Sequence, residues 1–174
     1  MSKILKSFKT NEDKLYSKIL LLSRNKLFYT KLCLNDTFQN RINLIFLHLS
    51  FIFILIKNAK NKVLYKEFYQ RTFDFVFKKI EINMREIGYS DTSVNKNMKF
   101  LVKVFYNILL NCEKYKNKTP EQKKLFIAKY LALNSNINSI NSVSLVDYFN
   151  KYLSFCLDLP PEKVLNGDLK FIYK

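Results

Sequence analysis

The sequence predicts an all-α protein, a single-domain bundle of about six to seven helices around a buried central helix at residues 37–57. The first observation is a run of fifteen residues between Arg41 and Lys57, in which the only polar side chains are those of Asn43, His48 and Ser50. The second is the spacing of apolar residues three and four apart in the flanking segments, which is typical of amphipathic helices. The third is the scarcity of Gly (2) and Pro (3) among 174 residues, which disfavours a turn-rich β-sandwich or barrel.

Apolar side chains surround the central segment on every side, a pattern typical of a helix buried in protein or in lipid. Its fifteen residues would form a helix about 22 Å long at about 1.5 Å per residue, which is shorter than the hydrocarbon core of about 30 Å. We therefore interpret the segment as a core helix rather than a membrane span. Asp36 is the expected N-cap of this helix, with Gln39 at the reciprocal position of a capping box.

Further helices are expected on both sides of the central one, each with a stripe of apolar residues. Before it, helices are predicted at residues 12–24, with Asn11 as the cap, and at about residues 26–32. After it, helices are predicted at about residues 62–87, 94–115, 120–132 and 145–158. Gly88 ends the first of these four, Ser93 caps the second, and Thr119-Pro120-Glu121-Gln122 starts the third. The Asn- and Ser-rich residues 134–144 are predicted to form a loop.

The expected organisation is one helical domain at residues 12–158, preceded by a flexible N-terminus at residues 1–11. Pro160-Pro161 is predicted to stop the last helix. The tail at residues 159–174 is expected to be extended and packed on the domain through Leu169, Phe171 and Ile172. The first thirteen residues lack the apolar core of a signal peptide, so a cytoplasmic protein is expected.

A net charge of +16 suggests an anionic partner, either nucleic acid or an acidic membrane surface. Lys96, Lys99 and Lys103 recur at helical spacing and are the candidate contacts with RNA or lipid phosphates. The alternative is a solvated face, because an abundance of Lys, Asn and Ile is also what an AT-rich genome produces. An RNA- or ribosome-binding helical protein is therefore one hypothesis for function, and DNA is not an expected partner.

The residues that carry most enzyme chemistry are sparse. Cys33, Cys112 and Cys156 are far apart and the chain has one His, so no zinc or redox motif is predicted and a reducing compartment is favoured. His48 is interpreted as a hydrogen-bonded core residue, with Asp74 as the one tempting partner for catalysis or for a structural tie. Phosphate loops and nucleophile motifs are not found. The expectation is a protein that is not an enzyme and uses no cofactor.

Several short motifs occur in an order that resembles one known family. They are Phe28-Tyr29, Asp36-Thr37, Arg41, Leu47-His48-Leu49, Asp74, Met84-Arg85-Glu86-Ile87-Gly88, Asp91 and Phe105-Tyr106. This set resembles the ubiquinol–cytochrome c chaperone family over about residues 12–158. The resemblance implies an all-helical assembly chaperone that holds newly made apo-cytochrome b during biogenesis of respiratory complex III.

The same resemblance implies partners and candidate surface residues. The expected partners are apo-cytochrome b, a small partner chaperone, and the ribosome or an anionic membrane surface. The candidate motif or partner-surface residues are Arg41, His48, Asp74, Arg85, Glu86, Asp91 and Tyr106. An alphaproteobacterial source is implied, with a cytoplasmic protein peripheral to the inner membrane, or a mitochondrial matrix protein if the chain is organellar.

The sequence departs from the expected family pattern at three turn or packing positions. Cys33 and Asn107 stand where glycine is expected, and Asn95 stands where proline is common. These departures concern local backbone geometry rather than the assignment.

Overall fold

The computed structural model describes residues 10–58, 62–131 and 140–173, and every secondary-structure element in these ranges is a helix. The elements are α1 (Asn11–Ser23), α2 (Lys26–Thr30), α3 (Phe38–Lys57), α4 (Lys62–Glu86), α5 (Asp91–Glu113), the 3-10 turn η1 (Tyr115–Asn117), α6 (Pro120–Tyr130), α7 (Ile140–Asp158) and α8 (Pro161–Leu165). The predicted all-α class is therefore confirmed.

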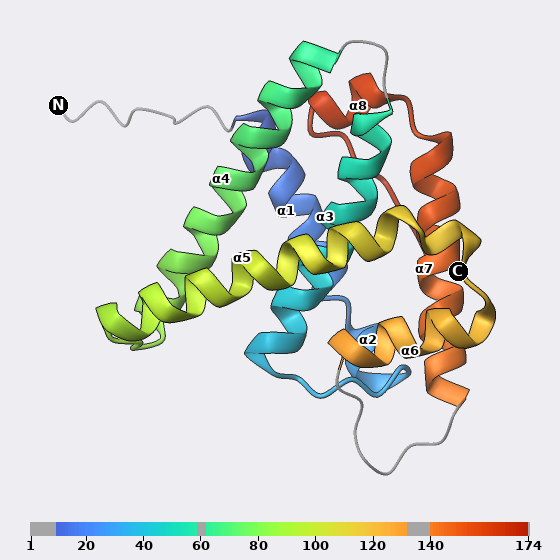
Figure 1. Cartoon of the computed structure of the whole chain (residues 1–174), viewed down its shortest axis with the longest axis horizontal. Coiled ribbons are helices and arrows are strands. Elements are labelled where there is room, and N and C mark those ends of the chain that lie inside the picture. The colour runs from blue at the N-terminus through green and yellow to red at the C-terminus, as the bar shows by residue number, and fades with distance from the viewer. Residues whose placement is uncertain (1–9, 59–61, 132–139, 174) are drawn as a thin grey trace, which may run out of the picture.

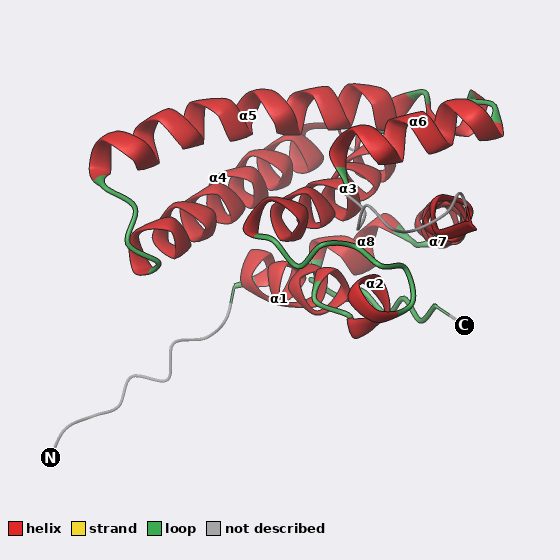
Figure 2. Ribbon diagram, turned by 90° about the horizontal axis from the view of Figure 1, so that it is seen from below, coloured by secondary structure: helices red, strands yellow, loops and turns green. Residues whose placement is uncertain are grey.

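The central element is α3, which packs against α1, α4, α5, α7 and α8. Figure 1 shows α5 crossing α3, and Figure 2 shows α1 and α2 on the opposite side of α3 from α5. Within the described ranges, α3 is the one helix long and apolar enough to cross a membrane, but 78% of its most apolar stretch is buried inside the protein. That burial fits a core helix, because its apolar faces are covered by the surrounding helices.

The residues that cap the helices differ from those expected at three of the four predicted starts, namely those of α1, α3 and α5. Thr10 caps α1 by accepting a hydrogen bond from the Asp13 amide (3.2 Å), so the predicted Asn11 cap is wrong. Ser90, and not Ser93, caps α5. At α6 the predicted capping box is confirmed, because Thr119 and Gln122 each accept a hydrogen bond from the other's backbone N–H.

The loop predicted at residues 134–144 is wrong for residues 140–144, which form the first turn of α7; residues 132–139 lie outside the described residues. The buried stripe of α7 begins at Leu145 and continues through Tyr148, Phe149 and Tyr152. Once packing has formed a helix, adding a residue at its end requires no new nucleation. On the helix-propensity scale, an Asn or Ser in place of Ala lowers helix stability by no more than about 0.7 kcal/mol per residue. These residues therefore do not prevent the extension.

The C-terminal residues contain a short helix that the sequence pattern did not indicate. Pro161 starts α8, a position where proline's missing N–H costs nothing. Gly167 follows with φ of +71°, and an added Cβ there would lie 2.7 Å from the Asn11 carbonyl oxygen, so the end of α8 approaches α1 too closely for a side chain. Leu169 is buried and Phe171 packs on Tyr148 and Tyr152, whereas Ile172 is exposed, contrary to expectation.

The surface ion pairs of α4 are formed more with other elements than within the helix. The sequence of α4 places an acid four residues before a base at Glu67–Arg71, Asp74–Lys78 and Glu81–Arg85, and the described residues form an ion pair at the last of these. Arg71 instead binds Glu12 of α1, with its Nε 2.8 Å from a carboxylate oxygen. Ile87, which follows the end of α4, is exposed although its spacing from Met84 matches the apolar stripe of that helix.

Candidate functional site

The start of α3 is fixed by side chains from the loop before it. Thr37 caps the helix by accepting a hydrogen bond from the Asn40 amide (3.2 Å), so the predicted Asp36 cap is wrong. The Asp36 carboxylate instead receives two hydrogen bonds from Arg41, at 2.6 and 2.8 Å. These hydrogen bonds lower the pKa of Asp36 and raise that of Arg41. Gln39, the predicted box partner, donates to Asn43 one turn later.

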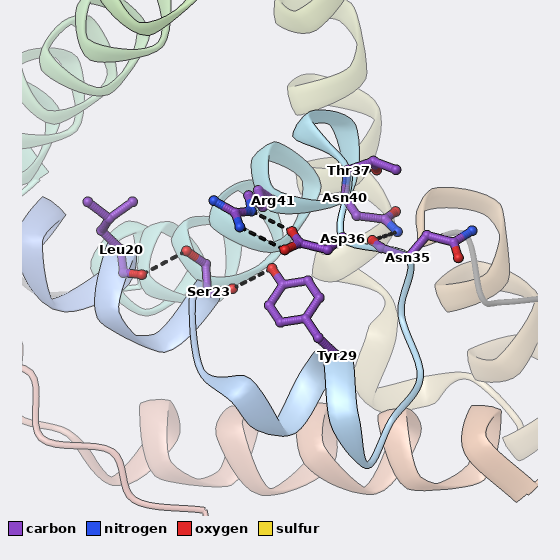
Figure 3. Close-up of polar contacts among 8 residues, drawn as sticks. All are labelled: Leu20, Ser23, Tyr29, Asn35, Asp36, Thr37, Asn40 and Arg41. Carbon is purple, nitrogen blue, oxygen red and sulfur yellow. Dashed lines mark hydrogen bonds and ion pairs between the residues drawn. The ribbon is translucent and has the colours of Figure 1, made fainter.

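Beside this start, hydrogen bonds join α2 to the end of α1 (Figure 3). The Tyr29 hydroxyl donates to the Ser23 carbonyl (3.0 Å), which lies at the end of α1 where helical carbonyls lack partners. The Ser23 hydroxyl donates to the Leu20 carbonyl, also at 3.0 Å. The Arg41 guanidinium lies 6.0 Å from the centre of the Tyr29 ring. Arg41 is therefore held in place by both Asp36 and Tyr29.

The turn between α4 and α5 lies beside the start of α3. Gly88 has φ of +95° and donates to the Arg85 carbonyl, while Tyr89 donates to the Met84 carbonyl. These two bonds form a Schellman motif, as expected for a glycine just past a helix end. Arg85 binds both Glu81 and Asp91, so it joins the end of α4 to the start of α5. The hydrogen bonds that Arg85 donates to these two carboxylates raise its pKa.

These elements form an exposed apolar surface with charged edges, which we call the corner surface: Phe38, Arg41, Glu86, Ile87, Tyr89 and Phe100. Phe38 packs on Tyr89, with ring centres 6.3 Å apart. A hollow of about 210 Å³ lies on one side of Phe38 and is also lined by Arg41, Glu86 and Ile87. A smaller hollow of about 80 Å³ is also lined by Phe38, together with Tyr89 and Phe100. Ile87 is 57% exposed and Phe100 is 55% exposed.

The structure gathers some of the sequence-derived candidates at this corner and places the others elsewhere. Arg41 and Glu86 line the larger hollow, and Arg85 and Asp91 hold the adjoining turn. Tyr106 lies farther along α5, where its ring is 5.9 Å from that of Phe73. Lys96, Lys99 and Lys103 are exposed on α5, and Phe100 lies among them at helical spacing. The lysine strip thus adjoins the corner surface.

His48 lies in the core and is not part of any surface. Its Nδ1 is 2.7 Å from the Leu44 carbonyl oxygen and its Nε2 is 2.7 Å from the Tyr148 hydroxyl. Burial lowers the pKa of His48 to about 4. The hypothetical His48–Asp74 pair is wrong, because Asp74 is exposed on α4 and accepts a hydrogen bond from Gln70. His48 therefore serves as a neutral tie between α3 and α7.

Three aromatic members of the corner surface were not identified from the sequence: Phe38, Tyr89 and Phe100. Phe100 occurs between lysines and outside the apolar stripe of α5, and that position was the available signal. Phe38 and Tyr89 flank a helix start and a glycine turn, where aromatic residues carry no periodic signal. Within the described residues, no group of three His, Cys, Asp or Glu side chains could hold a metal ion.

A solved structure and a family model both match this chain. The crystal structure of the Cbp3 homolog from Brucella abortus superposes with a TM-score of 0.79 at 20% sequence identity, covering 94% of this chain and 89% of that one. This likeness shows that the two proteins share a fold. No curated protein matches the sequence. The family model described as ubiquinol–cytochrome C chaperone matches residues 30–171. Because that match spans most of the sequence, the chain belongs to the ubiquinol–cytochrome c chaperone family.

Proposed function

We propose that this protein is a non-enzymatic assembly chaperone that binds newly made cytochrome b and supports biogenesis of the ubiquinol–cytochrome c reductase complex. Family membership supports the chaperone role. The corner surface supports the binding of an apolar client. It exposes Ile87 and Phe100 next to hollows that a client side chain could fill.

The chemistry of the corner surface suits a segment of a membrane protein before insertion. Such a segment is mostly apolar and is flanked by polar residues. Phe38, Ile87 and Phe100 offer apolar contact, while Arg41 and Glu86 at the edge can pair with flanking charges. Arg41 is already positioned by Asp36 and Tyr29, so little side-chain entropy is lost when it engages a partner. We propose that the protein acts in the cytoplasm or at the surface of the inner membrane.

Co-purification with cytochrome b tests the proposal. A tagged Ile87→Ser/Phe100→Ser variant should recover much less cytochrome b than the unmodified protein, because both anchors are removed from the corner surface. The matched control is Leu125→Ser/Leu157→Ser, which alters two exposed apolar residues on α6 and α7. Equal recovery by the two variants would show that this corner does not hold the client. Failure of the unmodified protein to recover cytochrome b would reject the proposed function.

A second function is favoured by the exposure of Lys96, Lys99 and Lys103 on one face of α5. Within the described residues, none of the three forms an ion pair. We propose that this strip contacts phosphates of ribosomal RNA or of an anionic membrane, as an accessory to client binding or as the main activity.

A further inference from the structure

A second concave site lies at the opposite end of α3 and α4 from the corner surface. The groove has a volume of about 370 Å³ and opens between the end of α3, the start of α4 and the end of α5. This volume falls within the range of small-molecule sites, about 300–1,000 Å³. On α3, the corner hollows are lined by residues up to Ile45 and the groove by residues from Phe53, about 12 Å farther along the helix, and the two sites share no lining residue. The groove is therefore independent of the proposed client site.

The inner wall of the groove is apolar and firmly packed. Phe53 and Ile56 are buried, and the ring centres of Phe53 and Tyr69 are 4.2 Å apart. The apolar and aromatic lining residues are Phe53, Ile54, Ile56, Tyr65, Tyr69 and Leu109. Such a wall favours an apolar ligand, because burying the ligand's apolar surface is favourable and an apolar ligand has no polar groups to leave unpaired.

The rim of the groove is positively charged. Lys57, Lys62, Lys66 and Glu113 line it, and the Lys57 ammonium lies 2.6 Å from the Glu113 carboxylate. That ion pair neutralises the one acid of the rim. Lys62 and Lys66 form no ion pair within the part of the chain that the structure describes. The rim therefore carries two uncompensated positive charges, which complement an anionic head group.

The first turn of α4 continues this pattern onto the outer surface. Val63 is 71% exposed and Leu64 is 41% exposed, and both lie between Lys62 and Lys66 in the sequence. Apolar side chains next to lysines are typical of segments that lie in a membrane interface, where the apolar groups enter the acyl region and the ammonium groups stay among the head groups.

We propose that the groove binds an acyl chain of an anionic phospholipid at a membrane surface. The chain lies against Phe53 and Leu109, the phosphate lies between Lys62 and Lys66, and Val63 and Leu64 enter the interface. A slender acyl chain suits a groove of about 370 Å³ better than a helix does, since a helix with side chains is about 10–12 Å across. This attachment goes beyond the proposed chaperone function, since it brings the protein to the membrane without a client.

Flotation with phosphatidylglycerol vesicles, with phosphatidylcholine vesicles as the neutral comparison, tests the proposal on the full chain. Leu109→Trp fills the groove and should weaken binding to the anionic vesicles, whereas Leu110→Trp changes the exposed neighbour outside the groove and should not. Lys62→Glu/Lys66→Glu should weaken binding at least about 25-fold, since each basic residue near an anionic surface contributes about fivefold.

The charge control is Lys26→Glu/Lys31→Glu, which alters two exposed lysines on and beside α2 and lowers the net charge of +16 by the same four units. It should retain most of the binding. Equal losses in the two double variants would overturn the proposal in favour of general charge attraction. Loss of binding in a Lys96→Glu/Lys99→Glu/Lys103→Glu variant alone would overturn it in favour of contact through α5. Unaltered binding by Leu109→Trp would overturn the role of the groove.

Three further measurements complete the test. Stoichiometric binding of a fluorescent fatty acid in solution, without vesicle binding, would overturn the phospholipid assignment in favour of a free fatty acid. Far-ultraviolet circular dichroism of each variant must match that of the unmodified protein before its binding is compared. Cytochrome b recovery by Leu109→Trp should be unchanged in detergent extract, so failure of the lipid site would leave the proposed client site standing.

Discussion

The Nε2 atom of His48 accepts a hydrogen bond from the hydroxyl of Tyr148, a residue 100 positions later in the chain, at 2.7 Å. The contact of the other ring nitrogen, Nδ1, shows that the Tyr148 hydroxyl is the donor of this hydrogen bond. His48 Nδ1 faces the Leu44 carbonyl oxygen at 2.7 Å, and a carbonyl can only accept, so Nδ1 carries the proton. In the neutral ring Nε2 is then the acceptor. One imidazole thus satisfies two buried groups and joins α3 to α7.

Replacing His48 with Ala should lower the free energy of unfolding by about 2–4 kcal/mol, from a cavity and an unpaired Tyr148 hydroxyl. Tyr148→Phe removes the hydroxyl alone and should cost about 1–2 kcal/mol. Denaturant titration of both variants and of the double variant measures their coupling. If the double variant lost the sum of the two single losses, the two side chains would not be coupled.

The stability of the protein should fall between pH 7 and pH 5 because of His48. Its pKa is about 4 in the folded protein and near the ordinary 6.5 in the unfolded chain. Because the unfolded chain binds the proton first, the full stability is present above pH 6.5 and is lost as the pH falls toward 4. The loss between pH 7 and pH 5 should be about 2 kcal/mol.

Chemical denaturation at several pH values measures this loss, and the His48→Ala variant is the control. His48 is the only histidine, so the difference in pH slope between the two proteins isolates its titration. The carboxylates of Glu12, Asp36 and Asp147 have lowered pKa values and affect both proteins alike at more acidic pH. Identical slopes from pH 7 to pH 5 would contradict the prediction.

The helical class and the central helix were predictable because they follow from patterns along the sequence. Fifteen residues with apolar groups on every side leave few alternatives to a buried helix, and Thr119 has a proline and a matching Gln beside it. The other caps were harder to predict, because adjacent Thr, Asn, Asp and Ser residues offer several acceptors. At α3 the choice depends on Arg41, which binds the Asp36 carboxylate and leaves Thr37 as the cap.

The candidate site was only partly predictable, because its residues meet through tertiary structure. Arg41 and Glu86 were identified, but nothing in the sequence brings Phe38 beside Tyr89 or leaves Phe100 exposed. The partner of His48 was equally inaccessible, since Tyr148 is on α7 and Asp74 seemed nearer along the chain. Asn43 is a further example, because it donates to the carbonyl of Tyr130 at the end of α6.

Replacing Cys33 with Gly should give a more stable protein than replacing it with Ala. Cys33 has φ of +55°, the left-handed region that costs an L-residue about 1–2 kcal/mol and glycine little. Glycine also gains entropy in the unfolded chain, which offsets about 0.4–1 kcal/mol of that relief. Both variants lose the weak contacts of the sulfur with the Thr30 and Lys31 carbonyls, so their difference isolates the backbone term.

Thermal unfolding of the two Cys33 variants measures the difference, which should be up to about 1.6 kcal/mol in favour of glycine. This position is also where the family resemblance led us to expect glycine. An Ala variant as stable as the Gly variant would show that the loop relaxes out of the left-handed conformation when the sulfur is removed.

Reversing Lys96, Lys99 and Lys103 to Glu should distinguish a chaperone from an RNA-binding protein. The three lysines are exposed on α5, and exposed substitutions usually change stability by no more than about 0.5 kcal/mol each, so the variant should fold. An RNA-binding protein that lost three phosphate contacts would bind all RNA sequences more weakly. The slope of its log affinity against log salt would also flatten by roughly three units.

A cytochrome b chaperone should behave differently, because apolar contact with Phe38, Ile87 and Phe100 is little screened by salt. We expect the triple variant to recover cytochrome b nearly as well as the unmodified protein, with a loss confined to recruitment to the ribosome or a membrane surface. Affinity for labelled RNA across a salt series, measured beside cytochrome b recovery, tests both expectations. A folded triple variant that bound no cytochrome b at any salt concentration would show that the lysine strip itself holds the client, because the apolar anchors of the corner surface remain intact in that variant.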